Sequence, residues 1–425
     1  MEKEALLAKS FFLLFIGHSP CRSAKEERND EKWFGSLWRG NMKRKLLGLI
    51  LAVFMMFALA MNAGSEEAKP EAKGEAKPGA KPAISLEEIK NLLGMSIYLQ
   101  GGYTFNFNNP DSLTNEQRLF DKKANTFLID LAQIQFAKDP AVGELGYKLK
   151  LSYGETAKFI HSAGLGNPND AFDFTEAYVD YVAPLGSGLK LRFGKFATYI
   201  SSETIEARDN FNYSRSFLYN FATPFTHTGF MAGYKFSETF TASLYIVNGW
   251  DVATDNNKGK TFGASFVVTP IEPLALTFNF MYGPEQPNST SNNRFLFDWI
   301  GAFKATKNLT FMANVDYGHE EKVPLNGGKD SEWYGVAGYA KYDFTEFFST
   351  SIRAEYFNDP DGVRTGIAQE LMEITLTAEF KIAKNLLVRP EYRHDGSTKN
   401  AFDSEHNTFD TKSQDTIAVG VMYTW

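Results

Sequence analysis

From about Met95 to the end of the chain, apolar and polar residues alternate with a period of two. The final segment shows this most clearly, because the apolar or aromatic residues at 417, 419, 421, 423 and 425 alternate with Ala, Gly, Met and Thr. Such alternation predicts a β-strand with one apolar face. About sixteen segments of about ten residues repeat it, and this is the length of a tilted strand that crosses a membrane. The segments start near residues 96, 126, 143, 173, 188, 227, 239, 260, 273, 294, 308, 332, 346, 370, 385 and 415.

The connections between these segments alternate between short turns and long polar loops. The short turns lie near 138–142, 184–188, 237–239, 270–273, 306–308, 343–346 and 383–385. The long loops lie near 108–125, 154–172, 198–226, 250–259, 283–293, 319–331, 358–369 and 396–413. A transmembrane barrel has short periplasmic turns at one end and long external loops at the other. The sequence therefore predicts an all-β fold, a transmembrane antiparallel up-and-down β-barrel of about 16 strands over residues 95–425.

A soluble β-sandwich or propeller is the alternative, because it would also contain alternating strands and turns. Two features favour the membrane barrel. The polar faces carry full charges, as with Lys148 and Lys150, so these faces must meet water while the opposite faces stay apolar along the whole chain. The sequence also lacks the four-strand repeat of a propeller.

The N-terminal part of the chain differs from the rest. Residues 42–63 have the features of a secretory signal peptide, with the basic stretch Met42–Lys45, the apolar run Leu46–Ala60 and small residues for cleavage. We interpret residues 1–41 as an upstream extension that arises from a start codon assigned too early. Residues 64–94 predict a linker rich in Lys, Ala, Glu and Pro, followed by a short amphipathic helix. A membrane anchor is the alternative for the apolar run, which is short for a helical span.

Composition narrows the class of protein further. The 425 residues include 38 Phe and 19 Tyr, which argues against intrinsic disorder, and one Cys, which excludes a disulfide framework. The formal net charge is −7, so we expect no nucleic acid partner, because phosphate binding needs clustered positive charge. An exported, acidic protein without disulfides fits the bacterial envelope. We therefore expect localisation in the bacterial outer membrane, in contact with its lipid.

Six short motifs follow one another between about residues 170 and 300. They are Glu176-Ala177-Tyr178-Val179, Gly194-Lys195-Phe196, Tyr213-Ser214-Arg215-Ser216, His227-Thr228-Gly229, Asn248-Gly249-Trp250-Asp251 and Gly283-Pro284-Glu285. Their order and spacing resemble the OmpL-like putative beta-barrel porin family of Gram-negative bacteria. The resemblance implies an outer-membrane porin, which allows passive diffusion of small hydrophilic solutes or ions through a water-filled channel. It brings no catalytic or ligand-binding residue to this sequence, and it names no solute.

If the apolar faces meet lipid, the alternate positions face the lumen, where charged residues tune ion selectivity. The longest loop is the third long loop, residues 198–226. General porins fold this loop into the barrel, so similarity predicts that it narrows the channel here, with acidic loop residues facing a basic wall. The candidate pore-lining or constriction residues are Lys148, Lys150, Lys190, Arg192, Glu203, Glu206, Asp209, Arg215, Arg353, Arg389 and Arg393. Two alternatives stay open: the loop packs over the barrel mouth, or arginine–carboxylate pairs only brace the wall.

The sequence offers weaker support for an enzyme, a sugar-selective channel or a structural barrel. After residue 63 there are five histidines, and none lies in an H-E-x-x-H or nucleophile-elbow motif, so we expect no enzyme, cofactor or metal site. A substrate-selective, sugar-type channel is an alternative, in which Tyr178, Tyr245 and Trp333 would contact the solute; the same residues could equally fill space in the lumen. A non-conducting structural or adhesive surface barrel is another. By analogy with other porins, a homotrimer is a further hypothesis.

Overall fold

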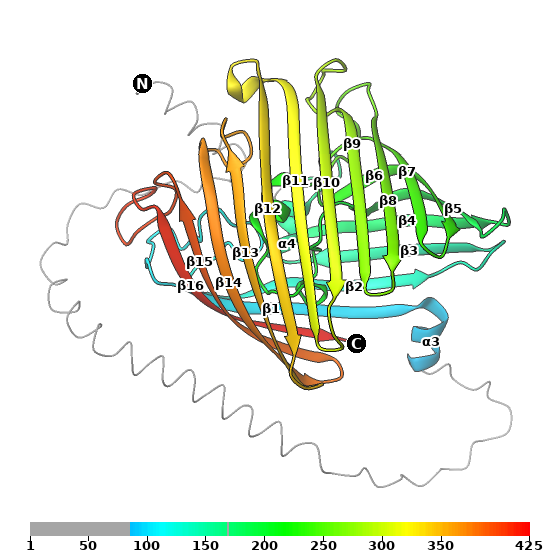
Figure 1. Ribbon diagram of the computed structural model, residues 1–425, viewed down its shortest axis with the longest axis horizontal. Coiled ribbons are helices and arrows are strands. Elements are labelled where there is room, and N and C mark those ends of the chain that lie inside the picture. Colours follow the sequence, from blue (N-terminus) through cyan, green and yellow to red (C-terminus); the bar gives the residue numbers. More distant parts are fainter. Residues whose placement is uncertain (1–85, 168–169) are drawn as a thin grey trace, which may run out of the picture. The chain divides into compact units, whose positions relative to one another are not determined.

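The computed structural model describes residues 86–167 and 170–425, and the expectations for residues 1–41, 42–63 and 64–85 lie outside the described residues. Sixteen antiparallel strands form a closed barrel in which each strand pairs with its sequence neighbours and β1 pairs with β16 (Figure 1). The strands are β1 (Met95–Asn106), β2 (Thr126–Lys138), β3 (Leu145–Tyr153), β4 (Phe172–Ala183), β5 (Leu189–Ala197), β6 (Thr226–Ser237), β7 (Phe240–Val247), β8 (Thr261–Ile271), β9 (Leu274–Pro284), β10 (Asn293–Lys304), β11 (Leu309–Val323), β12 (Lys329–Asp343), β13 (Phe348–Asp359), β14 (Gln369–Ala383), β15 (Leu386–Ser397) and β16 (Ser413–Thr424). The predicted up-and-down barrel is confirmed.

Every strand begins within three residues of the predicted position. The largest difference is at β12, which begins at Lys329 because Val323 of β11 pairs with it beyond a bulge. The predicted long loop 319–331 is therefore wrong, and the connection is the short segment 324–328 with the 3-10 turn η3 (Pro324–Asn326). Both faces of this hairpin end are polar, so the period-two signal that marks a strand is lost there.

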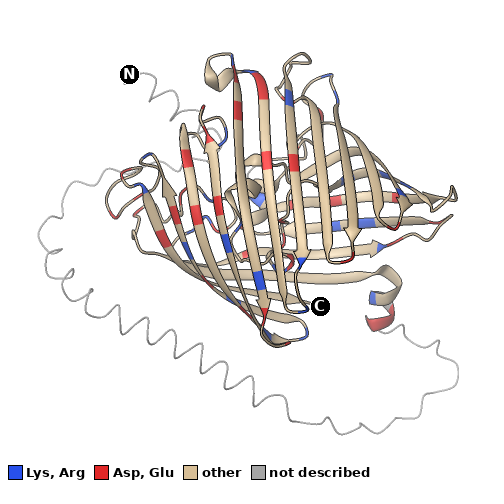
Figure 2. Cartoon of the chain, in the orientation of Figure 1, with Lys and Arg blue, Asp and Glu red and all other residues tan. Residues whose placement is uncertain are grey.

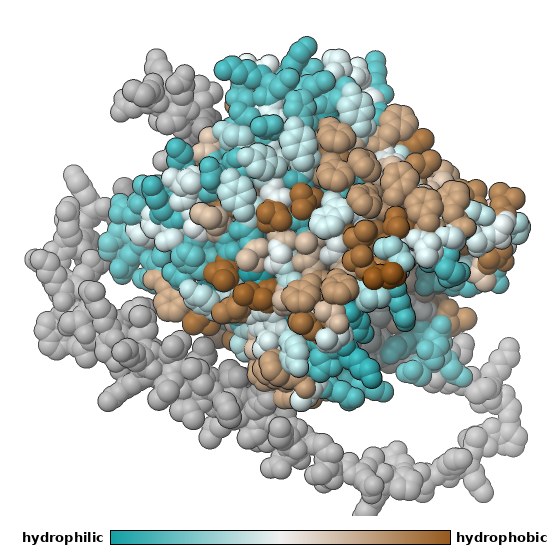
Figure 3. Space-filling view, in the orientation of Figure 1, coloured by the Kyte–Doolittle hydropathy of each residue, from teal (hydrophilic) through white to brown (hydrophobic). Residues whose placement is uncertain are grey.

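The strands carry their apolar residues on the outside of the barrel. Phe127 and Ile129 of β2 are 79% and 69% exposed, and Phe193 of β5 is 66% exposed. The neighbouring Asp130 points inward and is buried. Figure 3 shows hydrophobic side chains spread over the strand-covered surface. This arrangement is the inverse of a soluble β-sandwich, and it is favourable where lipid replaces water around the barrel.

The two ends of the barrel differ. One end, called here the short-turn rim, carries the short turns, the start of β1 and the end of β16. The β4–β5 turn at this rim needs left-handed backbone, which Gly186 (φ 56°) and Gly188 (φ 101°) adopt without a Cβ penalty. The opposite end carries the longer loops and is called the long-loop rim.

The helices of the described chain are short. α3 (Leu86–Leu93) precedes β1 at the short-turn rim, where the Lys90 ammonium lies 4.3 Å from the ring centroid of Trp425. α4 (Glu155–Ile160) lies between β3 and β4. Across residues 86–167 and 170–425, no helix combines the length and the apolar character that a membrane span requires.

Candidate functional site in the barrel lumen

The connection between β5 and β6, residues 198–225, lies inside the barrel, and we keep the name third loop for it. It contains a 3-10 turn, η1 (Ala207–Asp209), and a π-helical turn, η2 (Leu218–Ala222). Residues 212–225 are all buried. The loop contacts inward-facing residues in the middle of strands on both sides of the barrel, so it crosses the lumen instead of covering the mouth. This placement agrees with the expectation from the sequence.

Two carboxylates of the wall hold the loop by its backbone N–H groups. The N–H groups of residues 217 and 218 donate to Glu355 of β13, both at 2.6 Å. Those of residues 213 and 214 donate to Glu391 of β15, at 2.6 and 2.9 Å. An irregular buried segment cannot satisfy these donors within itself, and each one left unpaired would cost about 1–3 kcal/mol. The wall therefore stabilises a loop conformation that has little regular structure.

Three arginines of the same wall hold the loop by its carbonyl groups. Their guanidinium groups donate to the carbonyl oxygens of Ser214 (from Arg353, 2.8 Å), Arg215 (from Arg393, 2.6 Å) and Asn212 (from Arg389, 3.2 Å). Each arginine also pairs with a wall carboxylate, so its charge is balanced. All three side chains are at most 1% exposed, because the third loop covers them.

Two acidic residues of the loop pair with basic residues of the wall. Glu203 Oε1 lies 2.8 Å from Arg353 Nη1, and Glu206 Oε1 lies 2.7 Å from Lys150 Nζ. Burial alone would raise the pKa of Glu206, but the charge and hydrogen bond of Lys150 outweigh burial and lower that pKa to about 2. Glu206 is therefore ionised throughout the physiological pH range.

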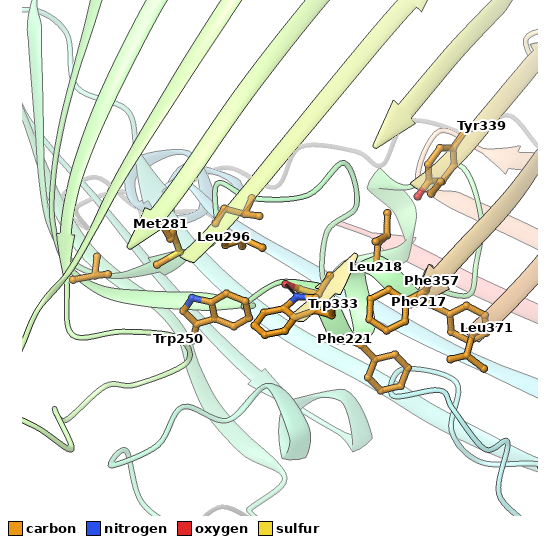
Figure 4. Close-up of a cluster of buried hydrophobic side chains, with 14 of the residues drawn as sticks. Phe217, Leu218, Phe221, Trp250, Met281, Leu296, Trp333, Tyr339, Phe357 and Leu371 are labelled. Carbon is orange, nitrogen blue, oxygen red and sulfur yellow. Dashed lines mark hydrogen bonds between the residues drawn. The ribbon is translucent and has the colours of Figure 1, made fainter. Parts of the chain in front are cut away.

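An apolar cluster fixes the second half of the loop (Figure 4). Phe217, Leu218 and Phe221 of the loop lie in one cluster with Trp333 of β12 and Phe357 of β13. Trp333 is fully buried, and its Nε1–H donates to the carbonyl oxygen at the end of η2 at 3.3 Å. The third loop is thus part of a packed core inside the lumen.

The aromatic residues considered for a sugar path have different surroundings. Trp333 is buried in the apolar cluster, and Tyr245 stacks on Tyr199 of the third loop with ring centroids 3.8 Å apart. Tyr178 is half-buried, and the guanidinium of Arg192 lies over its ring, 3.7 Å from the ring centroid. Two of the three therefore fill space between loop and wall and do not form an open aromatic track.

The candidate pore residues fall into two groups by exposure. The first group is covered by the third loop or belongs to it, with side chains at most 10% exposed: Lys150, Glu203, Glu206, Arg215, Arg353, Arg389 and Arg393. The second group keeps contact with water: Lys148 (23% exposed), Lys190 (35%), Arg192 (17%) and Asp209 (53%). Only the second group presents charge where a solute can reach it.

Several ion pairs of the inner wall that the third loop does not cover expose their basic partner. Lys190 Nζ and Arg192 Nε lie 3.0 and 2.8 Å from the carboxylate of Asp180, whose side chain is 3% exposed. The same relation holds for the pairs Lys148–Glu176 (23% against 4%), Lys341–Glu379 (18% against 5%) and Arg294–Glu320 (14% against 5%). The wetted side of these pairs is therefore positive.

Lys341 and Arg294 were not among the sequence candidates. Their inward positions on β12 and β10 follow the period-two pattern, which is the signal that identifies them. Figure 2 shows basic and acidic residues distributed along the strands as well as in the loops. The exposed basic side of the lumen pairs thus contrasts with the formal net charge of −7 for the whole chain.

The family model described as "Putative beta-barrel porin-2, OmpL-like" matches residues 93–425. The chain belongs to this porin family. No curated protein matches the chain.

Three solved structures resemble this porin in fold. They are DcaP of Acinetobacter baumannii (10% identity, TM-score 0.53, 78% of this chain and 96% of that chain), OprB of Pseudomonas putida (11%, 0.52, 80% and 96%) and an anion-selective porin from Comamonas acidovorans (11%, 0.50, 78% and 98%). At these identities the likeness concerns the fold alone.

In this porin, several motifs of the family resemblance meet near the long-loop rim. Glu285 accepts a hydrogen bond from the N–H of Trp250 at 2.8 Å, and its Oε2 would lie 2.6 Å from a Cβ added at Gly249. Asp251 accepts the N–H groups of residues 225 and 226, at 2.9 and 2.8 Å, where the third loop ends. These motif residues fix the ends of loops, which is a structural role.

Proposed function

We propose that this porin allows small hydrophilic solutes to diffuse passively through a water-filled path beside the third loop, with a preference for anions. The preference rests on one observation: the lumen ion pairs outside the cover of the third loop turn their basic partner to water and bury the acidic partner. Charge that lines an aqueous path raises the local concentration of ions of the opposite sign.

In this proposal, Lys148, Lys190, Arg192 and Lys341 line the path, since their side chains keep water contact. The covered arginines Arg353, Arg389 and Arg393, together with Lys150, Glu203, Glu206 and Arg215, act as positioning residues that hold the third loop. Asp209, on the exposed side of η1, would weaken the anion preference. The role is transport, and the mechanism needs no cofactor.

The test is a reversal potential in a planar bilayer across a salt gradient. The wild-type porin should give a potential of the sign that marks anion preference. The double variant Lys190→Gln/Arg192→Gln should shift it toward cation preference, and Asp209→Asn should shift it the other way. Lys235→Gln is a matched control, because this lysine lies near the short-turn rim and, among the residues that the structure describes, its side chain pairs only with the neighbouring Glu238. Cation preference in the wild-type protein, or no shift in the double variant, would refute the proposal.

We further propose export by residues 42–63 and assembly of the mature porin as a trimer in the outer membrane. N-terminal sequencing of the protein from an outer-membrane fraction should place the new terminus near residue 63. The mass of the detergent-solubilised protein, after subtraction of detergent, should equal three chains. A monomer mass, or an intact N-terminus at Met1 or Met42, would contradict the respective part.

A further inference from the structure

The loop between β13 and β14, residues 360–368, folds onto the third loop. Nε of Arg364 donates to the carbonyl oxygen of Phe221 at 2.6 Å, and Val363 and Ile367 pack against the apolar cluster. Asp359 fixes the start of this loop, because its carboxylate accepts the N–H groups of residues 363, 364 and 365 at 3.0, 2.9 and 2.7 Å. Since both ends of the loop lie at the long-loop rim, Arg364 is on the side of the third loop that faces this rim.

The terminal nitrogens of Arg364 have no partner within residues 86–167 and 170–425. A carboxylate pairs with each of Arg118, Arg192, Arg208, Arg294, Arg353, Arg389 and Arg393. Arg215 has no ion pair in this part of the chain, but its three guanidinium nitrogens all donate to carbonyl oxygens of the third loop. In Arg364 only Nε donates to such an oxygen, and the residue is half-buried, so Nη1 and Nη2 keep contact with water.

Two tryptophans and a second arginine surround the guanidinium of Arg364. Its central carbon lies 5.2 Å from the ring centroid of Trp250 and 5.0 Å from that of Trp333, and the two rings are neighbours in the apolar cluster (Figure 4). The guanidinium of Arg294 lies over the same rings, at 4.6 and 5.8 Å. Aromatic faces stabilise each cation, but the two cations still repel each other. Burial and the charge of Arg294 lower the pKa of Arg364 to about 10, so Arg364 stays charged at neutral pH.

The carboxylates in the surroundings of Arg364 bind other donors. Glu320 pairs with Arg294 at 2.6 Å, and Asp359 accepts the backbone N–H groups described above. Asp251 accepts the N–H groups of residues 225 and 226. All three charges favour a protonated Arg364, but none of the three carboxylates bonds to its guanidinium in the described chain. The terminal N–H groups are therefore available to a partner from outside the chain.

An oxyanion is the partner that fits these groups. A guanidinium is planar, and its two terminal nitrogens form a fork that matches two oxygens of a carboxylate or a phosphate. The second positive charge, on Arg294, favours an anion over a cation. Chloride would respond to the charge alone, since it lacks the paired oxygens that the fork matches. The alternative is a packing role, in which Arg364 only lies against the tryptophans and holds the end of η2.

We propose that the guanidinium fork of Arg364 binds a carboxylate or phosphate group of small solutes on the long-loop side of the third loop, with Arg294 as a second positive charge. The site would hold such solutes at the entrance of the path, before they reach the wetted lysines beside the third loop. The inference rests on the proposed anion preference, because it names the class of anion, oxyanions, that the path would admit.

The experiment follows the tryptophan fluorescence of the refolded porin in detergent at neutral pH, since Trp250 and Trp333 lie against Arg364. Sodium acetate and sodium phosphate are the probes, and sodium chloride at equal ionic strength is the reference. At least one oxyanion should give a saturable change that chloride does not give, and the tighter of the two identifies the group as carboxylate or phosphate.

Two variants and a control connect this binding to Arg364. Arg364→Gln should weaken the affinity by at least about tenfold, the equivalent of one hydrogen bond to a charged group. Arg364→Lys keeps the charge and loses the fork, so its affinity should also fall. Arg208→Gln makes the same change of charge at an arginine that donates to Thr424 at the short-turn rim, at 3.0 Å, and it should bind as the wild type does.

Three results would overturn the inference and leave Arg364 the packing role. They are no saturable change in the wild type, an equal change with chloride, and wild-type affinity in Arg364→Gln. Should Arg364→Gln fail to fold, wild-type affinity in Arg364→Lys would exclude recognition by the fork. The reversal potential separates this site from the proposed function. A porin that binds an oxyanion in this titration, but prefers cations across a salt gradient, would refute the proposed function and leave the binding site standing.

Discussion

Arg353 links the third loop to the barrel wall through both an ion pair and a backbone hydrogen bond. Its side chain is 0% exposed, and it pairs with Glu203 of the loop at 2.8 Å and with Glu373 of β14 at 2.6 Å. It also donates to the carbonyl oxygen of Ser214 at 2.8 Å. We therefore expect Arg353→Met, which keeps much of the volume and removes the charge, to release this part of the loop.

The magnitude follows from what the substitution leaves behind. Glu373 would keep Arg393, at 3.5 Å, but Glu203 would keep only the N–H of Ser216, at 2.7 Å. Removal of one partner from a buried ion pair costs about 3–5 kcal/mol, mostly because the other charge stays buried. The double variant Arg353→Met/Glu203→Gln removes that charge, so it should recover roughly 1–3 kcal/mol of the free energy of unfolding.

Two measurements check this reasoning. Denaturant titration of the refolded barrel gives the free energy of unfolding, and single-channel recording gives the conductance, which should rise as the loop leaves the lumen. Arg208→Met is a control at a more exposed arginine of the same loop, 31% exposed, whose guanidinium pairs with the neighbouring Asp209 at 3.4 Å and donates to the Thr424 hydroxyl at 3.0 Å. Because this arginine is not fully buried, its loss should cost clearly less than the loss of Arg353. If Arg353→Met behaves like Arg208→Met in both measurements, and the double variant gains nothing, the ion pair does not hold the loop.

Three further predictions concern the loop and its ends. Glu206→Gln should lower the free energy of unfolding at neutral pH by about 1.5–3 kcal/mol, the range for a hydrogen bond to a charged group. Because Lys150 lowers the pKa of Glu206 to about 2, the difference in unfolding free energy between wild type and variant, measured in an acid titration, should be full above pH 4.5 and vanish toward pH 2. Burial raises the pKa of Asp251 to about 6, so the protonated carboxyl stabilises the fold at low pH and this contribution to stability is lost as pH rises through 6. In Asp251→Asn the unfolding free energy should no longer fall over this pH range, and a variant with the same pH dependence of stability as the wild type would contradict the raised pKa. A Cβ added at Gly420 would lie 2.3 Å from the ring of Tyr213, so Gly420→Ala should displace the third loop and change the conductance, while Gly338→Ala, where the nearest atom lies at 4.0 Å, should not.

The motif residues of the family resemblance contact segments that are distant in the sequence. Trp250 and Glu285 are 35 residues apart in the chain, yet the N–H of one donates to the carboxylate of the other. Burial raises the pKa of Glu285 to about 7, which reflects how deeply the long loops enclose it. The sequence indicated a family through these residues, but the reason for each residue type is a contact with a distant segment.

The sequence by itself determined the strands, their order and the face on which each side chain lies. Alternation is a local property, since successive side chains of a strand point to opposite faces, and a lipid-facing surface makes the pattern continuous from strand to strand. Lys148 and Arg353 were placed on the inner face for this reason, and both lie there. The pattern failed only where both faces meet water, at the β11–β12 hairpin.

Only the tertiary structure decided which inward residues meet water. Lys190 and Arg353 occupy equivalent positions in the pattern, but one is 35% exposed and the other is 0% exposed under the third loop. The path of that loop depends on contacts between segments about 140 to 180 residues apart, such as those with Glu355 and Glu391. No local pattern encodes these contacts, because the free energy of burying an irregular loop comes from the partners that the closed barrel gathers around it.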